Sequence, residues 1–311
     1  MYDPTKPYKN RILKIIESTW NTPYVKVSRG LYPIIEKKFS FPEIQHTDGI
    51  GTKGFYHWEK RTFYNAAIDA LAMNLNDLAM VGAIPYALQN HIILPRDDHF
   101  AILEIVRAIA RECRKRNIAM TGGETSIRSD MRGMEISITV FGFIKTETKN
   151  KCKIGDTLIG IKSRGIHSNG MTKVREVFGK RYRDDFVSPT KIYIDTVLEL
   201  LSEYRINGMM HITGGAFTKI KDILYKADAY IVQPKKLLPQ AIFTEIYKRG
   251  VSNKTMYSTF NCGVGFVLSA PKSQADLILR KLKNADIIGE IVRGDGHVLI
   301  QSAFNNKAVV L

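Results

Sequence analysis

Four short groups of polar residues, each flanked by glycine, hold the side chains of this sequence that are best suited to binding a phosphate. The first is the string TDGIGTK, which begins at residue 47. Gly49 and Gly51 let backbone N–H groups approach a phosphate closely, and Lys53 would neutralise its charge. The carboxylate of Asp48 suits Mg²⁺, which prefers oxygen ligands and keeps its phosphate partners. A plain tight turn after a strand is the alternative interpretation.

The second group combines acidic residues with strong helix formers. Asp69 and Asn76 are two helical turns apart and share one helix face, with Asp77 beside it. Met73 lies on the same face, which should therefore be largely buried. Buried carboxylates need a partner, and a metal ion is the simplest one. Capped or salt-bridged acids are the alternative.

The third group is the string GGET, in which Glu124 follows a glycine pair, and the fourth lies in the second half of the chain. There the strings GIHSNG at residue 165 and HITGG at residue 211 each place a histidine, His167 or His211, among glycines and small polar residues. Such loops suit contacts to a phosphorylated sugar or to a developing charge. A lone loop histidine is more often a surface or capping residue, but two in such similar settings favour a functional role.

Length and composition predict a globular protein of two domains. The chain has 311 residues, with 44% hydrophobic and 24% charged residues. Its formal charge of +16 would attract nucleotides and sugar phosphates as well as nucleic acid. The short basic runs at residues 111–116 and 145–153 are typical of solvated helix faces or loops, so nucleic-acid binding is the minor hypothesis.

The sequence carries no signal for a membrane or for export. No window approaches the roughly 18 continuous apolar residues of a membrane span, and the N-terminus lacks a hydrophobic signal segment. Cys113, Cys152 and Cys262 have neither metal-ligand nor disulfide spacing, which predicts a cytoplasmic protein. Cys262 lies in the string FNCGVG, where a buried small residue is favoured over a catalytic nucleophile.

Hydrophobic periodicity predicts the elements that position these groups. We expect helices over residues 10–20, 66–81, 100–116 and 189–204. Strands are expected over residues 41–47, 87–94, 118–121, 134–144, 157–161, 287–292 and 298–301. A polar, lysine-rich stretch at residues 145–155 separates two mixed α/β halves, so we place the domains at residues 1–148 and 149–311. Neither a Rossmann nor a Walker-type glycine loop occurs, so any nucleotide would be bound by another design.

Taken in order, these strings resemble the motifs of the aminoimidazole ribonucleotide synthetase (phosphoribosylformylglycinamidine cyclo-ligase) family. The resemblance runs from about Phe41 to Gly294. The strings MHITGG at residue 210 and FNCGVG at residue 260 are its most specific parts, because they are longer than chance readily supplies. The other matching segments are residues 47–53, 68–85, 122–125, 165–170, 189–193 and 288–291.

The resemblance implies a two-domain PurM-like fold of mixed α+β and α/β type. Its N-terminal domain would bind ATP and form an intersubunit β-barrel with helices outside, in a homodimer, and its C-terminal domain would be α/β. ATP and Mg²⁺ would be the cofactors and formylglycinamidine ribonucleotide the second substrate. In the implied reaction ATP activates the formyl oxygen and a nitrogen closes the imidazole ring, which releases ADP, phosphate and aminoimidazole ribonucleotide.

Carried over motif by motif, the resemblance implies roles for individual residues. The metal ligands would be Asp48, Asp69 and Asp77. The ATP-binding residues would be Asp48, Gly49, Gly51, Thr52, Lys53, Asp69, Asn76 and Glu124. The substrate-binding residues would be Ser168, Asn169, Gly170, Thr213, Gly214 and Gly215. The catalytic residues would be His167, His211 and Lys53.

The sequence departs from the family pattern at its shorter start and at residues 28–33 and 126–131. These changes leave open how a nucleotide is clamped and whether Lys14 of the first helix approaches it. One alternative is another ATP-using member of the superfamily, such as a selenophosphate synthetase, a thiamine-phosphate kinase or a hydrogenase-maturation protein. The other is a non-catalytic, basic relative that binds nucleotides or nucleic acid.

Overall fold

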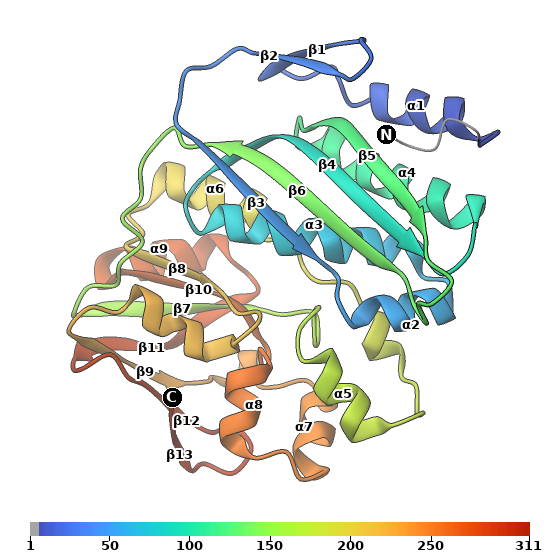
Figure 1. Cartoon of the computed structure of the whole chain (residues 1–311). Coiled ribbons are helices and arrows are strands. Elements are labelled where there is room, and N and C mark those ends of the chain that lie inside the picture. The colour runs from blue at the N-terminus through green and yellow to red at the C-terminus, as the bar shows by residue number, and fades with distance from the viewer. Residues whose placement is uncertain (1–5) are drawn as a thin grey trace. The chain divides into compact units, whose positions relative to one another are not determined.

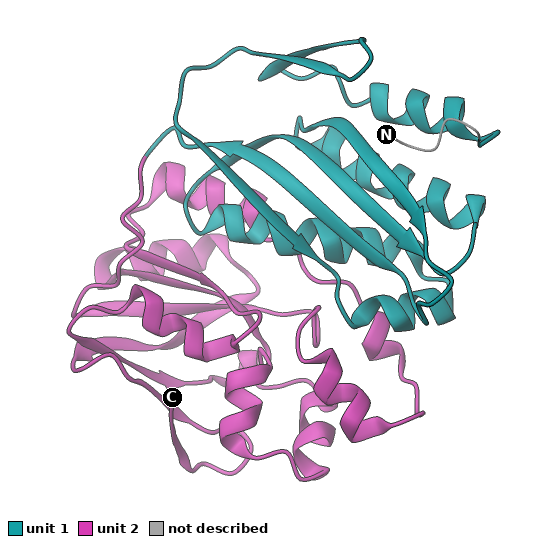
Figure 2. Ribbon diagram, in the orientation of Figure 1, with its two compact units in different colours: residues 1–146 teal, residues 147–311 magenta. Residues whose placement is uncertain are grey.

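The computed structural model describes residues 6–311 and divides the chain into two compact units. The first unit ends at Thr146, and the second runs from Glu147 to Leu311 (Figure 2). Each unit has its own sheet and its own buried core of aliphatic and aromatic side chains.

The first unit is a four-stranded sheet with helices packed on one face, preceded by a helix and a two-stranded ribbon (Figure 1). Its elements are α1 (Lys9–Glu17), β1 (Val25–Ser28), β2 (Ile34–Lys37), β3 (Glu43–Gly49), α2 (Lys53–Lys60), α3 (Phe63–Ala79), β4 (Ile84–Leu94), α4 (His99–Lys115), β5 (Ala119–Ile127) and β6 (Glu135–Phe143).

The sheet of the first unit has the strand order β3-β6-β4-β5, in which only β4 and β5 run parallel. Ile136, Ile138 and Val140 of β6 are fully buried against the face that α3 and α4 cover. The residues between them point to the other face, where the hydroxyl groups of Thr47 and Thr139 lie 2.8 Å apart and exposed. Within residues 6–311 no sheet closes into a barrel.

The second unit is built on a seven-stranded sheet of order β13-β12-β9-β11-β7-β10-β8. Its strands are β7 (Asp156–Lys162), β8 (Gly208–His211), β9 (Ala227–Val232), β10 (Val264–Pro271), β11 (Ala285–Arg293), β12 (Val298–Gln301) and β13 (Ala308–Val310). Its α-helices are α5 (Met171–Phe178), α6 (Ile194–Glu203), α7 (Ala241–Lys248), α8 (Asn253–Thr259) and α9 (Lys272–Lys281).

The helices and strands expected from periodicity are present, with three informative differences. Helix α2 was not expected, and the helix expected over residues 189–204 begins only at Ile194, because residues 188–193 adopt no regular secondary structure. The string GGET lies inside β5 rather than in a loop after a shorter strand. In the described part of the chain, no helix is both long and apolar enough to cross a membrane.

Candidate active site

The turn that follows β3 places its backbone N–H groups against a carboxylate from β6. Glu135 Oε1 accepts hydrogen bonds from the N–H of Ile50 at 3.0 Å and of Gly51 at 3.3 Å. A Cβ at position 49 would lie 2.5 Å from the same oxygen, so a larger residue there would displace the carboxylate of Glu135 from the turn. Gly51 has a φ of +52°, which glycine adopts without strain. The turn therefore presents N–H groups in the manner of an anion-binding loop, and Glu135 supplies the negative charge that they contact.

Glu135 is a candidate that the sequence motifs did not single out. Burial raises the pKa of its carboxyl above the ordinary value. The N–H groups of Gly51 and Ile50 oppose this rise in pKa, and the neighbouring charge of Asp48 adds to it. The sequence signal that could have identified Glu135 is that it is the one charged residue of β6 and stands at the start of that strand.

Replacing Glu135 with glutamine is expected to stabilise the protein at pH 7, by less than about 1 kcal/mol, and to have little effect near pH 4. A carboxyl whose pKa is raised on folding stabilises the fold at low pH, and this contribution is lost as the pH rises through the folded-state pKa. Glutamine stays uncharged, and its oxygen can still accept the two N–H groups. Urea denaturation at both pH values measures the effect, and a variant less stable than the wild type at pH 7 contradicts it.

Lys53 begins α2, directly after its N-cap residue Thr52, and its side chain is buried. The ammonium lies 2.9 Å and 2.8 Å from the two carboxylate oxygens of Asp69 in α3. His57, one turn further along α2, places Nε2 at 2.8 Å from Asp69 Oδ2 and Nδ1 at 2.7 Å from the hydroxyl of Thr62. These contacts join α2 to α3 through one buried polar cluster.

The cluster of Lys53, His57 and Asp69 is strongly coupled by charge. Burial alone would raise the pKa of Asp69, but the charge of Lys53 and the hydrogen bond from His57 outweigh it and hold that pKa well below its ordinary value. Asp69 therefore forms a buried salt bridge, which was the alternative to a metal site in the interpretation of the sequence. Its role as a metal ligand stays a prediction and requires Lys53 or His57 to release an oxygen. The sequence motifs did not single out His57. Its four-residue spacing from Lys53, which places both side chains on one face of a helix, was the signal that could have identified it.

Asp48 and Asp77 are linked through two side chains that lie between β3 and α3. Asn74 Nδ2 donates a hydrogen bond to the backbone oxygen of Asp48 at 3.1 Å, and Asn74 Oδ1 lies 3.0 Å from His46 Nδ1. His46 Nε2 is in turn 3.4 Å from Asp77 Oδ2. Asn76 is fully buried, whereas Asp48 and Asp77 are both partly exposed. The structure thus brings Asp48 and Asp77 to the helix-covered side of the sheet.

Glu124 does not join these residues. In β5 it lies opposite His91 of β4, which lies opposite Ser137 of β6. Ser137 lies opposite Gly49 of β3, so this row shares one face of the sheet. Asp48 is the next residue along β3 and points to the other face. Glu124 and Asp48 are therefore three strands apart, on opposite faces of the sheet.

The three aspartates predicted to bind Mg²⁺ thus differ in environment: Asp69 is buried and ion-paired, whereas Asp48 and Asp77 are partly exposed. Among residues 6–311 no three His, Cys, Asp or Glu side chains form a group that could hold a metal ion by themselves. Asp48 and Asp77 nevertheless offer hard oxygen donors. A Mg²⁺ ion that arrives with a nucleotide keeps phosphate and water ligands and needs only one or two carboxylates from the protein. The donor set fits this kind of ion and does not fit a metal held by protein groups alone.

In the second unit, three loops meet at the residues predicted to bind substrate. Ser168 Oγ lies 3.0 Å from Thr190 Oγ1, and Asn169 Nδ2 donates a hydrogen bond to Thr213 Oγ1. A Cβ on Gly214 would lie 3.4 Å from Asn169 Oδ1, so the two loops are in close contact. The structure therefore joins the strings GIHSNG and HITGG, which are more than 40 residues apart in the sequence.

Glycine and one buried asparagine shape these loops. Gly170, with a φ of +72°, precedes α5, and a Cβ there would lie 2.4 Å from the ring of Phe260. Gly215 also has a positive φ, of +81°. Asn261 Nδ2 donates hydrogen bonds to the backbone oxygens of Gly165 at 2.8 Å and Ile166 at 3.2 Å. Asn261 belongs to the string FNCGVG, and these hydrogen bonds fix the backbone of the loop that contains GIHSNG.

His167 and His211 are buried in the second unit rather than exposed in its loops. The ring of Tyr193 lies 6.3 Å from each of them, centroid to centroid. His167 has a left-handed φ of +64°, and its Nε2 accepts a hydrogen bond from the N–H of Arg164 at 3.1 Å. Their catalytic role stays a prediction, and their contacts with Tyr193 and Arg164 support a role in holding the loops.

Cys262 is fully buried, and burial raises the pKa of its thiol well above the ordinary value. The thiolate that a nucleophile requires is therefore disfavoured. The interpretation of Cys262 as a buried structural residue is confirmed. Cys113 and Cys152 are also buried and free, as their spacing predicted.

Two family models match this chain. The model of the AIR synthase related protein, N-terminal domain, matches residues 42–144, and that of its C-terminal domain matches residues 153–301. A phosphoribosylformylglycinamidine cyclo-ligase of Saccharolobus solfataricus is 35% identical over 300 residues, which are 93% of this chain and 90% of the relative. The Clostridium perfringens enzyme of the same name is 35% identical over 83% of this chain and 84% of its own.

Two solved structures with the same fold are a maturation protein and a kinase. Hydrogenase maturation protein HypE in complex with ATP superposes with a TM-score of 0.68 at 16% identity, over 99% of this chain and 95% of its own. Thiamine-monophosphate kinase from Stenotrophomonas maltophilia superposes with a TM-score of 0.66 at 16% identity, over 98% of both chains. At such identities the likeness shows the fold alone.

Proposed function

This chain belongs to the AIR synthase related family, and we propose on that basis that it catalyses ATP-dependent closure of the imidazole ring in purine biosynthesis. It converts formylglycinamidine ribonucleotide to aminoimidazole ribonucleotide and releases ADP and phosphate. The observation that carries this function is the 35% identity to a cyclo-ligase over 93% of the chain. A hydrogenase-maturation or kinase activity receives less support, because those proteins share only the fold with this chain.

The reaction needs activation because an amide oxygen is a poor leaving group. The formyl oxygen of the substrate attacks the γ-phosphorus of ATP, and the bond to the bridging oxygen breaks as ADP leaves. A substrate nitrogen then attacks the activated formyl carbon, the ring closes, and the oxygen departs as phosphate. The protein contributes positioning and charge neutralisation.

The first unit supplies the groups suited to ATP. Asp48 and Asp77 would hold Mg²⁺, which when bound neutralises phosphate charge. Gly49, Gly51 and Thr52 would place backbone N–H groups near the phosphates. To bind phosphate, the N–H groups of the turn must first lose their hydrogen bonds to Glu135. The raised pKa of Glu135 makes this loss less costly in free energy than it would be for a carboxylate of ordinary pKa.

Lys53, Asp69 and Asn76 contribute to the same ATP site, although their buried contacts favour positioning of α2 and α3 over direct contact with phosphate. The position of Glu124 on the other face of the sheet means that it would reach the nucleotide only through a second subunit. We therefore include Glu124 only as part of a homodimeric site. The intersubunit barrel of that dimer would use the sheet face that carries Thr47 and Thr139. Light scattering that shows a single chain mass at micromolar concentration would exclude this dimer.

The second unit supplies the groups suited to the ribonucleotide. The small polar residues of its joined loops would contact the phosphorylated sugar; they are Ser168, Asn169, Gly170, Thr213, Gly214 and Gly215. His167 and His211 support these loops from inside and would influence charge that develops on the substrate. The cytoplasm, where the substrates of purine synthesis are made, is the proposed location.

Replacing Asn169 with alanine is expected to raise KM for formylglycinamidine ribonucleotide by about tenfold and to leave KM for ATP within about twofold. The variant removes the amide that donates a hydrogen bond to the hydroxyl of Thr213. Steady-state kinetics with each substrate varied in turn measures both constants. A change confined to KM for ATP would contradict the assignment of these loops to the ribonucleotide.

The deciding experiment for the function is ADP release coupled to direct detection of aminoimidazole ribonucleotide. Purified chain is incubated with formylglycinamidine ribonucleotide, ATP and Mg²⁺, with omission of each as a control. Substrate-dependent ADP release in equal amount to the ring-closed product supports the proposal. ATP binding without any ring-closed product would overturn it and return the kinase and maturation activities to consideration.

A further inference from the structure

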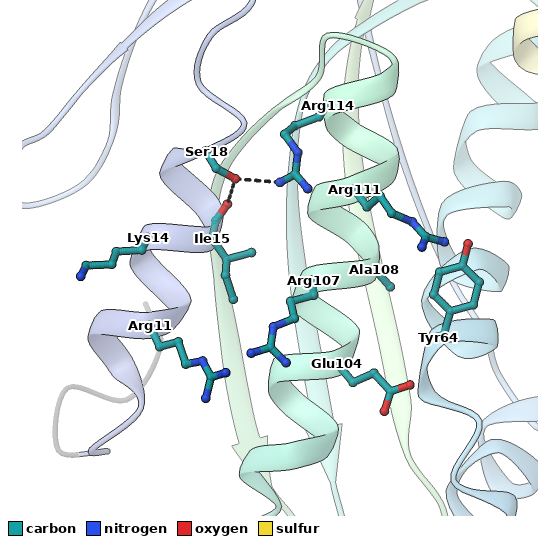
Figure 3. Close-up of a pocket in the computed structure, with 10 residues that line it drawn as sticks. All are labelled: Arg11, Lys14, Ile15, Ser18, Tyr64, Glu104, Arg107, Ala108, Arg111 and Arg114. Carbon is teal, nitrogen blue, oxygen red and sulfur yellow. Dashed lines mark hydrogen bonds between the residues drawn. The ribbon is translucent and has the colours of Figure 1, made fainter.

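A basic cleft lies in the first unit, where α1 packs beside α4 (Figure 3). Its volume is about 650 Å³, within the range of small-molecule pockets. Ile15 and Ala108 form an apolar part of its wall. Five basic side chains line it: Arg11, Lys14, Arg107, Arg111 and Arg114.

The basic groups come from both helices and lie around one space. In Figure 3, Arg11 of α1 and Arg107 of α4 extend into the gap between the helices. Arg114 donates a hydrogen bond to Ser18 Oγ at 2.7 Å and so ties the end of α1 to α4. Arg111 lies over the ring of Tyr64, with 4.5 Å between the guanidinium carbon and the ring centroid.

The charge of this cleft is only partly balanced by nearby acids. Among the described residues Glu104 is the one carboxylate that lines it, and Arg111 Nε lies 3.6 Å from Glu112 Oε1. Within residues 6–311, neither Arg11, Lys14 nor Arg107 has a carboxylate within ion-pair distance. Like charges four residues apart on a helix, such as Arg107 and Arg111, destabilise it. An anion in the cleft would offset this repulsion.

The cleft is separate from the glycine turn of the proposed ATP site. Helices α1 and α4 pack near β5, which is one edge strand of the four-stranded sheet. The turn follows β3, which is the opposite edge. Lys14, considered above as a contact of the nucleotide, lines this cleft and not the turn.

We propose that this cleft is a second anion site, which binds a small molecule carrying two or more linked phosphates. Arginine suits this role because its planar group makes paired hydrogen bonds to phosphate. Arg107 and Arg114 are seven residues apart on one helix, about 10 Å, which exceeds the span of one phosphate. A linked phosphate chain can contact both ends of such a row, whereas a single phosphate contacts one.

The test uses inorganic tripolyphosphate as the probe, titrated into the full chain by calorimetry at low salt. Three proteins are compared: the wild type, the pair Arg11→Glu with Arg107→Glu, and the control pair Lys272→Glu with Lys283→Glu. Lys272 and Lys283 are exposed in the second unit, so the control makes the same change in net charge away from the cleft. We expect the cleft pair to bind one tripolyphosphate fewer per chain, or at least about tenfold more weakly, and the control to match the wild type.

Turnover and oligonucleotide binding, measured beside tripolyphosphate binding, separate this site from the alternatives. Retained ring-closing turnover in the cleft pair shows that the site is not the ATP site, and lost turnover in a folded cleft pair overturns the proposal. Equal loss of binding in the cleft and control pairs overturns it too, since net charge would then explain the effect. Loss of single-stranded oligonucleotide binding with unchanged tripolyphosphate binding would instead identify a nucleic-acid surface. Should the double variant fail to fold, Arg107→Gln alone is used.

Discussion

Replacing Asp48 with asparagine is expected to lower kcat for ring closure by about two to three orders of magnitude while the protein stays folded. Asparagine keeps the size of the side chain and removes the charge that would hold a nucleotide-bound Mg²⁺. The backbone oxygen of Asp48, which accepts the hydrogen bond from Asn74, is unaffected by the change. The side-chain oxygen that accepts the N–H of Gly49 at 2.7 Å is also retained.

The effect of Asp48→Asn is measured as single-turnover and steady-state ADP release, with circular dichroism and urea denaturation as tests of folding. Asp276→Asn in α9 is the matched control, because Asp276 is an exposed aspartate in the second unit. It should retain wild-type turnover. A folded Asp48→Asn protein with turnover like that of the wild type would remove Asp48 from the catalytic machinery. Partial rescue of the variant by higher Mg²⁺ concentration would instead support the metal role.

Replacing Asp69 with asparagine is expected to reduce the free energy of unfolding by about 3–5 kcal/mol. The change leaves the ammonium of Lys53 buried without a counter-charge, and it weakens the contact to His57. An exposed ion pair, such as that between Arg128 and Asp130, should contribute far less, because water and salt screen its charges. Urea denaturation of Asp69→Asn and of Asp130→Asn therefore compares a buried ion pair with an exposed one.

The buried pair also predicts a dependence of stability on pH. Because the folded-state pKa of Asp69 lies below its unfolded value, its contribution is present above the unfolded pKa and is lost as the pH falls through the folded one. The wild type should therefore lose stability relative to Asp69→Asn below about pH 4. A double variant, Asp69→Leu with Lys53→Met, should recover part of the loss at pH 7, since no buried charge is left unpaired. Equal losses in the single and double variants would show that packing, and not charge, explains the effect.

The local pattern of the chain was sufficient to predict most of its helices and strands. The apolar spacing over residues 66–81 and 100–116 predicted α3 and α4 within a few residues, because helical periodicity depends only on residues that are close in the sequence. The motifs also identified the strings that come together, since Asn169 and Thr213 are in contact. Helix α2 was missed because it is short and follows directly on a glycine turn.

The partners of the charged side chains were decided only by the tertiary structure. Glu135 contacts the glycine turn because β6 pairs with β3, a pairing between segments about 90 residues apart. The same register sets Glu124 and Asp48 on opposite faces of the sheet, which a list of motifs cannot reveal.

The sequence by itself determined the family, the order of the elements and the residues worth testing, because each depends on local strings and spacing. Burial and pairing depend on which distant segments pack together. Lys53 was expected beside a phosphate, yet the packing of α2 on α3 directs it to Asp69. Arg111 and Arg114 belong to a basic run that was expected to form a solvated helix face or loop, and only the position of α1 beside α4 makes them part of the wall of a cleft.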